Sequence, residues 1–237
     1  MTEETIIKKA DAFDAVPTLE DDSAHVAVVD YPWTFSNQDR PGAASNYQPE
    51  DWDMEDNERF PEILDELARP LVDGAWMFVF ADDDVLPAFR RAVEETFTYR
   101  KTLIWDTERM GLGHYFRSRH GYIIAATNGD TDRRVTKAPT VFEAPAPQRQ
   151  PGRADTYPTE KPARLLEEML RPVTSPGERV IEPFCGSAPA LEAARTLDLR
   201  YWGVDVSDDA LRRARSRGEQ TRLTTATDGG RHTDNHE

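Results

Sequence analysis

The fold is decided by VIEPFCGSA at residues 180–188 and RYWGVDV at residues 200–206. The first stretch is an apolar run that meets a proline and a glycine, which predicts a buried strand ending in a tight turn. The second predicts another strand, which ends at Asp205. The interval between Gly186 and Asp205 has room for one helix, expected over residues 190–197, as a strand–helix–strand unit requires. This pattern predicts an α/β fold with a mostly parallel sheet covered on both faces.

The turn between these elements has the chemistry of a nucleoside-binding site. Glycine allows backbone amides to approach a ligand closely, and an acid at the end of the next strand can accept hydrogen bonds from ribose hydroxyls. Cys185 is the only cysteine and is expected to be a small packed residue. The candidate cofactor-binding residues here are Glu182, Phe184, Cys185, Gly186, Ser187 and Asp205.

A second motif, DYPW at residues 30–33, follows the apolar run HVAVV at residues 25–29. Asp30 offers a carboxylate that can accept hydrogen bonds from a weakly nucleophilic amine. Trp33 offers an aromatic wall that can replace the stacking lost by a base that leaves its duplex. Pro32 fixes the turn between them, because electrostatic assistance of this kind requires groups that are held in place.

Four motifs of the chain, the last of them in two parts, resemble those of the β-class DNA amino-methyltransferases. DYPW resembles Asp-Pro-Pro-Tyr or Asp-Pro-Pro-Trp, and EPFCGSA resembles Asp-Pro-Phe-x-Gly-Ser-Gly. YPTEKP at 157–162 resembles Thr-x-Lys-Pro, while LIWD at 103–106 and GLGHYFRSRH at 111–120 resemble Trp-x-Lys and a glycine-rich Arg-x-x-His-Glu run. The resemblance covers residues 24–217. The base motif precedes the cofactor motif, as in this class, whose Rossmann-like sheet is a circular permutation of the usual methyltransferase order.

The resemblance implies methylation of an exocyclic base amine in DNA, with S-adenosyl-L-methionine as cofactor and no metal. Adenine N6 is favoured over cytosine N4, because cytosine-N4 members more often carry serine where Asp30 stands. Asp30, Tyr31, Pro32 and Trp33 would be catalytic. Thr159 and Lys161 would join the cofactor-binding residues, near the methionine end.

Several positions depart from the family pattern and leave two alternatives open. Tyr31 replaces a proline, Ala188 a glycine, Asp106 a lysine and Gly121 a glutamate. One alternative is adenine-N6 methylation of RNA, since the aspartate–tryptophan pair also resembles messenger-RNA adenosine methyltransferases. The other is a degenerate homologue that binds nucleic acid or a partner subunit without catalysis.

Two long polar segments are expected to form target-recognition loops, at about residues 34–57 and 131–157. The second is rich in proline and locally basic, and arginine can bind phosphates or read guanine edges. Double-stranded DNA is the expected partner, and relatives of this class are often dimers or act beside a restriction endonuclease. The candidate nucleic-acid-binding residues are His114, Arg117, Arg119, Arg133, Arg134 and Lys137.

The remaining pattern predicts one methyltransferase domain over residues 1–217 and a disordered tail over 218–237. Residues 1–10 are expected to be a frayed arm. Thr159 and Pro162 are expected to cap and begin a helix. The other expected elements are helices over 58–71, 85–97, 161–170 and 208–217, and strands over 75–80, 99–105 and 121–127.

The formal net charge of −15 is unusual for a protein expected to meet DNA, and only five of the 237 residues are lysine. Acid-rich, lysine-poor surfaces are typical of a salt-saturated cytoplasm, where the Debye length is about 3 Å or less and the charge repels DNA weakly. We therefore expect a halophilic archaeon or its virus as the source; an acidic mesophilic protein is the alternative. We expect no signal peptide or membrane span, and a cytoplasmic location.

Overall fold

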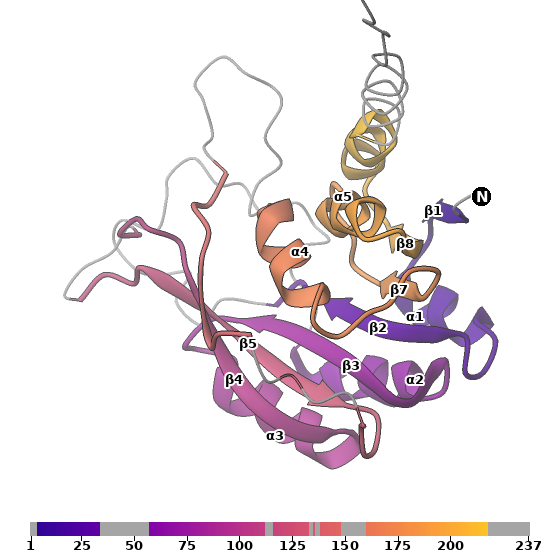
Figure 1. Cartoon of the computed structure of the whole chain (residues 1–237), viewed down its shortest axis with the longest axis horizontal. Helices are drawn as coiled ribbons and strands as arrows, with labels where there is room; N and C mark the ends of the chain where they lie inside the picture. The colour runs from indigo at the N-terminus through magenta and orange to yellow at the C-terminus, as the bar shows by residue number, and fades with distance from the viewer. Residues whose placement is uncertain are drawn as a thin grey trace, which may run out of the picture.

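A computed structural model describes residues 4–33, 57–111, 116–132, 135, 138–147 and 160–217. Its strands form one eight-stranded sheet in the order β1-β8-β7-β2-β3-β5-β4-β6 (Figure 1). Neighbouring strands run parallel except at β5, which is antiparallel to both β3 and β4. The strands are β1 (Thr5–Lys9), β2 (Ala24–Val29), β3 (Leu71–Ala81), β4 (Thr98–Asp106), β5 (His120–Thr127), β6 (Val141–Glu143), β7 (Arg179–Glu182) and β8 (Arg200–Asp205). The predicted α/β fold is confirmed, and the strand order is consistent with the permuted arrangement.

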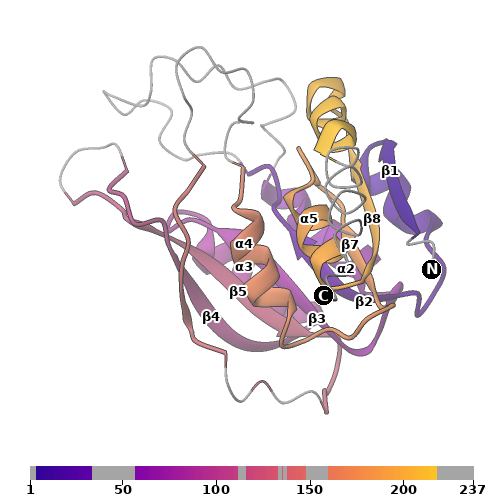
Figure 2. The ribbon, with the colours of Figure 1, turned by 45° about the horizontal axis from the view of Figure 1, so that its top comes forward.

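Helices cover both faces of the sheet (Figures 1 and 2). One face carries α1 (Ala12–Ala15), α2 (Phe60–Ala68) and α3 (Leu86–Thr96). The other carries α4 (Ala163–Leu170), α5 (Pro189–Thr196) and the helical residues 208–217. Side chains of β2 alternate between the two cores, because successive residues of a strand point to opposite faces.

The expectation of a frayed arm at residues 1–10 is wrong for the part that the structure describes. Residues 5–9 form β1, which pairs in parallel with β8 from Thr5–Tyr201 to Lys9–Asp205. Only Ile6 and Ile7 give this strand an apolar pattern. Its backbone hydrogen bonds to the edge of β8 supply the order that the short pattern does not indicate.

Three further boundaries differ from the expectation. The helix expected over 58–71 ends at Ala68, because Leu71 already begins β3. Pro162 is the N-cap of α4 and does not lie in its first turn, while Thr159 lies outside the described residues. Within the proline-rich segment, residues 141–143 form β6 along the edge of β4. The buried Phe142 and a hydrogen bond of 2.7 Å from Trp105 Nε1 to the Ala144 carbonyl hold this strand in place.

The centre of the sheet is the point where its strand order reverses. β7 and β2 are parallel neighbours with the pairs Val26–Val180 and Ala27–Ile181, but the chain continues from β7 to β8 on one side and from β2 to β3 on the other. In open α/β sheets ligands bind outside the carboxyl ends of the strands at such a switch point. Both sequence motifs follow these two carboxyl ends. Among the described residues, no helix is long and apolar enough to cross a membrane.

Candidate functional site

The carboxyl ends of β2 and β7 bring the DYPW motif beside the EPFCGSA turn. The two strands are hydrogen-bonded neighbours, so their ends lie about 5 Å apart. The side-chain amine of Lys161, at the start of α4, forms an ion pair with Asp30 Oδ2. The same ammonium lies 5.1 Å from the centroid of the Phe80 ring, at the end of β3. Segments 131 residues apart in the sequence therefore meet at one carboxylate.

Lys161 is largely removed from solvent, since its side chain keeps 11% of its exposure and that of Asp30 keeps 26%. A lysine is rarely buried without a charged partner, so Asp30 and Lys161 hold each other in position. The ion pair occupies Oδ2, and no hydrogen bond to Oδ1 is found among the described residues. The site thus presents a fixed carboxylate oxygen at the switch point.

The two aromatic residues of DYPW lie in different environments. Tyr31 is 1% exposed, and its ring packs edge-on against Phe60, Phe89 and Phe184 at centroid distances of 5.2–5.8 Å. Its ring is therefore part of the core, and the tyrosine places no second aromatic surface at the mouth of the site. Trp33 is partly exposed and packs edge-on against Phe89 at 6.2 Å. Trp33 is the aromatic residue of the motif that a planar ligand can reach.

The turn after β7 is shaped by left-handed backbone at two positions. Gly186 has a φ of 50°, and its backbone N–H donates to Asp205 Oδ2 at 2.8 Å. Asp205 Oδ1 accepts from the Ser207 backbone N–H at 2.9 Å, so this carboxylate joins the turn to the end of β8. Ala188, the N-cap of α5, is fully buried and also left-handed at φ 55°. A residue with a Cβ is strained in this region, which explains the glycine of the family pattern.

Beneath the turn lies a buried pair, Glu182 and Tyr201. The Tyr201 hydroxyl donates to Glu182 Oε2. The pKa of Glu182 is raised to about 8, mainly by burial; the charges of Asp30 and Asp205 also raise it, and the hydrogen bond from Tyr201 lowers it. Gly203 makes room for the tyrosine, because a Cβ there would lie 2.5 Å from its hydroxyl oxygen. At neutral pH Glu182 is mostly protonated, which limits the negative charge under the site.

Ser187 and Cys185 of the turn are buried, and their contacts are structural. Ser187 Oγ donates to Glu160 Oε2 at 2.5 Å. Arg217 pairs with Glu160 and Glu192 at 2.8 and 2.7 Å, which ties the last described helix to the start of α4 and to α5. Burial raises the pKa of the Cys185 thiol well above its usual range, so this thiol is a packed group and no nucleophile. Phe184 remains partly exposed.

The contribution of β1 to this edge is not indicated by the sequence pattern. The backbone N–H of Ala10 donates to the Asp205 carbonyl at 3.1 Å, which places the start of α1 beside the end of β8. Asp11 caps α1 by accepting from the Phe13 N–H at 2.9 Å. The Phe13 ring lies edge-on to Phe184 at 6.4 Å and under the Arg59 guanidinium at 3.6 Å. In the sequence, the only signal for this part of the site is Asp11, a helix-capping residue type, followed by a short apolar segment.

The predicted nucleic-acid-binding residues are only partly described. Arg117 and Arg119 lie in the connection from β4 to β5, at the same edge of the sheet as Asp30, because β4 runs parallel to β3. Arg117 Nε donates to the Gly111 carbonyl and Arg119 Nε to Asp106 Oδ1, both at 2.8 Å. Both side chains are exposed. His114, Arg133, Arg134, Lys137 and the expected loop over 34–57, apart from Asn57, lie outside the described residues.

The model of a protein family described as DNA methylase, the N6/N4 methyltransferases, matches residues 24–216. The chain belongs to this N6/N4 DNA methylase family.

Curated relatives match shorter parts of the chain. The type II methyltransferase M2.DpnII of Streptococcus pneumoniae is 36% identical over 66 residues, which cover 28% of this chain and 25% of that protein. M.EcaI of Enterobacter cloacae is 41% identical over 51 residues, covering 22% and 11%. M.HhaII of Haemophilus parahaemolyticus is 18% identical over 153 residues, covering 63% and 66%. The matched part is thus a quarter or less of the first two relatives.

Solved structures share the fold over most of the chain. The complex of M1.HpyAVI with SAM has a TM-score of 0.66 at 17% identity, covering 90% of this chain and 98% of that one. TTHA0409 from Thermus thermophilus, complexed with S-adenosyl-L-methionine, has a TM-score of 0.66 at 18% identity and covers 92% and 94%. The cytosine-N4-specific PvuII DNA methyltransferase has a TM-score of 0.68 at 12% identity and covers 90% and 87%. At these sequence identities, the structural similarity shows that the fold is shared.

Proposed function

We propose that this chain is a β-class DNA amino-methyltransferase that transfers a methyl group from S-adenosyl-L-methionine to adenine N6. The observation that carries the proposal is the convergence of DYPW and the EPFCGSA turn at the switch point, with Asp30 held in an ion pair with Lys161. Family membership supports the reaction class. The geometry supplies the residues that would perform it.

The residues around the turn fit a cationic nucleoside cofactor. Gly186 brings backbone close to the ligand space, and Asp205 lies where ribose hydroxyls would be bound. Phe184 and Phe13 offer partly exposed aromatic surface on the same side. Asp205 supplies negative charge for a positively charged sulfonium group, whereas the charges of Asp30 and Glu160 are balanced by Lys161 and Arg217. The cofactor, when bound, supplies an electrophilic methyl group.

Asp30 would act on the amine that receives this group. The lone pair of an exocyclic amine is delocalised into the ring, and a hydrogen bond from the amine to Asp30 Oδ1 would localise it toward the incoming methyl. Lys161 would keep the carboxylate oriented through Oδ2. Trp33 would stack on the extruded base. The amine would lose one proton, to Asp30 or to solvent, as it accepts the methyl group.

Asp30 favours adenine N6 as the target, because cytosine-N4 members of the family more often carry serine there. The shared fold does not decide this point, since a cytosine-N4-specific enzyme is among the similar structures. Duplex DNA would approach the edge that carries Arg117 and Arg119. Homodimerisation and partnership with a restriction endonuclease are further proposals that rest on the family resemblance.

The acidic composition supports a source with a salt-rich cytoplasm. At molar ionic strength the −15 charge is screened within about 3 Å, so the phosphates of DNA can approach the acidic surface. The exposed arginines would then make short-range contacts with these phosphates.

The test is methyl transfer from labelled S-adenosyl-L-methionine in molar potassium chloride, followed by nucleoside analysis of the product. Duplex DNA and single-stranded RNA are offered separately. We expect N6-methyladenine in the duplex DNA. Labelled N4-methylcytosine would support the reaction class but contradict adenine as the target base. Label in RNA alone would favour an RNA methyltransferase. No transfer by folded protein would favour a degenerate homologue.

A further inference from the structure

The start of α4, α5 and the helical residues 208–217 meet beside the turn after β7 (Figure 2). Arg217, on the last of these segments, donates from Nη2 to Glu160 Oε1 at 2.8 Å and from Nη1 to Glu192 Oε2 at 2.7 Å. The other carboxylate oxygen of Glu160, Oε2, accepts from Ser187 Oγ at 2.5 Å. Glu160 therefore joins the last described helix to the turn that carries the candidate cofactor-binding residues.

Ser187 lies at the point of this turn where the backbone most needs an anchor. Its two neighbours, Gly186 and Ala188, both have left-handed backbone, with φ of 50° and 55°. Backbone in this region persists only where surrounding contacts hold it. Asp205 fixes the Gly186 N–H at 2.8 Å, and Glu160 fixes the Ser187 hydroxyl. The first contact orders the side of the turn that faces β8, and the second orders the side that faces α4.

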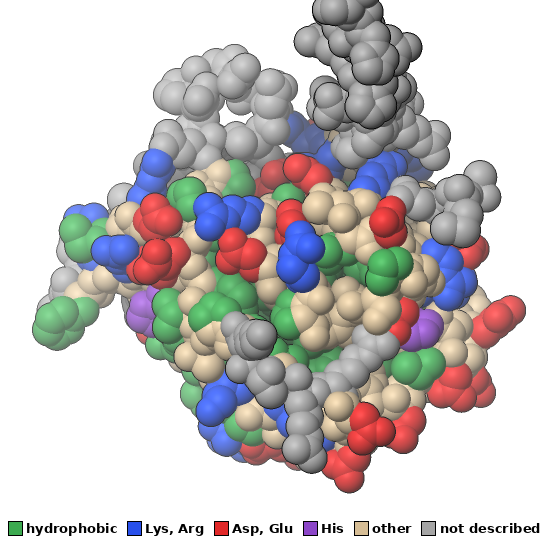
Figure 3. Space-filling model, in the orientation of Figure 1, with side chains coloured by type: hydrophobic (Ala, Val, Ile, Leu, Met, Phe, Trp, Pro, Cys, Tyr) green, Lys and Arg blue, Asp and Glu red, His purple; other side chains and the backbone are tan. Residues whose placement is uncertain are grey.

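The pair of Glu160 and Arg217 differs from the ion pairs on the surface of α4. In the view of Figure 3, acidic and basic side chains lie side by side over α4 and α5. Exposed pairs of this kind, such as Arg164 with Glu168, contribute little to stability. The side chains of Glu160 and Arg217 keep only 11% and 23% of their exposure. Burying charges costs free energy that their attraction returns only in part, so this pair is better suited to fixing an orientation than to stabilising the fold.

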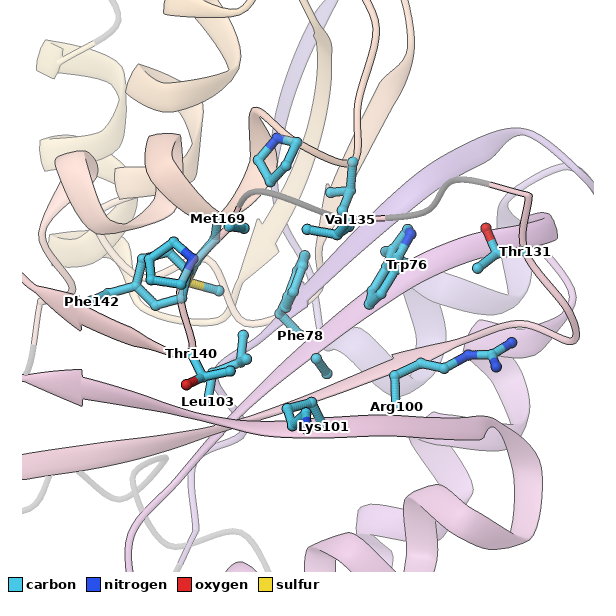
Figure 4. A pocket seen from close by; sticks show the side chains of 15 residues that line it. Trp76, Phe78, Arg100, Lys101, Leu103, Thr131, Val135, Thr140, Phe142 and Met169 are labelled. Carbon is cyan, nitrogen blue, oxygen red and sulfur yellow. The ribbon is translucent and has the colours of Figure 1, made fainter.

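Both segments that carry the pair are themselves anchored in the core. α4 buries Met169, which lies over the sheet in Figure 4. Within the helical residues 208–217, Arg217 follows the buried Ala214 by three positions and so lies on the same face of the helix. Packing elsewhere therefore fixes where Arg217 stands, and Arg217 fixes the carboxylate of Glu160.

We propose that Glu160, held by Arg217, is a positioning residue that orders the turn for the amino-acid part of the cofactor. The inference rests on the proposed function, because it concerns the same site. In that function the ribose lies at Asp205, and the methyl group must reach the amine at Asp30. Glu160 adjoins Lys161, which holds Asp30, so its side of the turn lies at the sulfur end of the cofactor. The amino-acid chain is attached to that sulfur.

The test is calorimetric titration of the full chain with S-adenosyl-L-homocysteine and, separately, with 5′-methylthioadenosine, which lacks the amino-acid part. Neither ligand has a charge on sulfur, so a change in affinity does not come from attraction between a sulfonium and an altered carboxylate. Glu160→Ala should weaken binding of S-adenosyl-L-homocysteine roughly tenfold and change binding of 5′-methylthioadenosine less than about twofold. Arg217→Gln should act in the same direction. Glu192→Ala removes the other carboxylate partner of Arg217 without touching the turn; it is the matched control and should bind both ligands like wild type.

Thermal melting of the ligand-free variants separates positioning from folding. Glu160→Ala and Glu192→Ala should each lower the melting temperature, whereas only the variants at Glu160 and Arg217 should change the ratio of the two dissociation constants. If one of these two variants does not fold, the other supplies the comparison. An unchanged ratio, with both ligands bound as in wild type or weakened equally, would overturn the inference and leave the proposed function standing. Folded wild-type protein that binds neither ligand would overturn both.

Discussion

At the scale of single residues, Glu182 links the chemistry of the site to the stability of the fold. Its carboxyl is fully buried, and its pKa of about 8 in the folded chain lies above the ordinary value of 4.5. The folded state therefore binds this proton more tightly than the unfolded state. The resulting stabilisation is complete below about pH 4.5 and is lost as the pH rises toward 8.

Replacing Glu182 with glutamine should remove this pH dependence while keeping an acceptor for the Tyr201 hydroxyl. Between pH 5.5 and 7.5 the free energy of unfolding of Glu182→Gln should rise by roughly 2 kcal/mol relative to wild type. Urea unfolding at the two pH values measures the difference. Glu66→Gln, at an exposed position of α2, should show no such change in the free energy of unfolding relative to wild type. Equal pH profiles for Glu182→Gln and wild type would contradict this prediction.

Ala188 shows the cost of departing from the family pattern. Its left-handed backbone at φ 55° strains any residue that has a Cβ. Ala188→Gly should raise the free energy of unfolding by about 1 kcal/mol, measured by thermal melting. Ala88→Gly, in the ordinary helical backbone of α3, should lower it by about 1 kcal/mol. A destabilised Ala188→Gly would show that the methyl group packs well enough to offset the strain.

At the scale of elements, the connection from β4 to β5 is the described segment most suited to contact DNA. Arg117→Ala and Arg119→Ala should each weaken duplex binding roughly tenfold and reduce the slope of log affinity against log salt by about 1. Fluorescence anisotropy across a potassium chloride series measures both. Arg91→Ala, at an exposed position of α3, serves as control. Unchanged affinity in both loop variants would remove this connection from the DNA interface.

The elements that the sequence predicts well are those with long local patterns. The apolar runs of β2, β3 and β8 are buried on both faces, so their composition alone identifies them. β1 was missed because its order comes from pairing with β8, almost 200 residues later. β6 was missed because it is three residues long and depends on Trp105 and Phe142.

In the candidate site, too, local patterns predict some features and tertiary contacts determine the others. The two motifs are local, and their spacing predicts which strand ends they follow. The ion pair between Lys161 and Asp30 joins segments 131 residues apart, and no local pattern specifies it. The burial of Tyr31 is also a tertiary effect, because Phe60, Phe89 and Phe184 come from α2, α3 and the turn after β7.

At the scale of the whole molecule, the charge of −15 should make stability depend on salt. Screening reduces repulsion among the acidic side chains, so the folded state should gain stability as potassium chloride rises. We expect the melting temperature to be about 5 °C higher at 2 M than at 0.1 M, equivalent to roughly 2 kcal/mol. Scanning calorimetry measures the shift, and chloride is used because sulfate would itself strengthen apolar burial. A melting temperature that falls with salt would contradict a high-salt origin.

We propose that Asp30 and the turn at Gly186 form one active site, in which Asp30 acts on the target amine. The most direct test compares single-turnover methyl transfer to duplex DNA by wild type, Asp30→Ala and Asp83→Ala, with cofactor affinity measured on the same samples. Asp83 is an exposed aspartate between β3 and α3 and serves as the matched control. We expect Asp30→Ala to keep cofactor affinity within a few-fold and to lose at least about a hundredfold in transfer rate, while Asp83→Ala should transfer like wild type. Transfer by Asp30→Ala at the wild-type rate would contradict it.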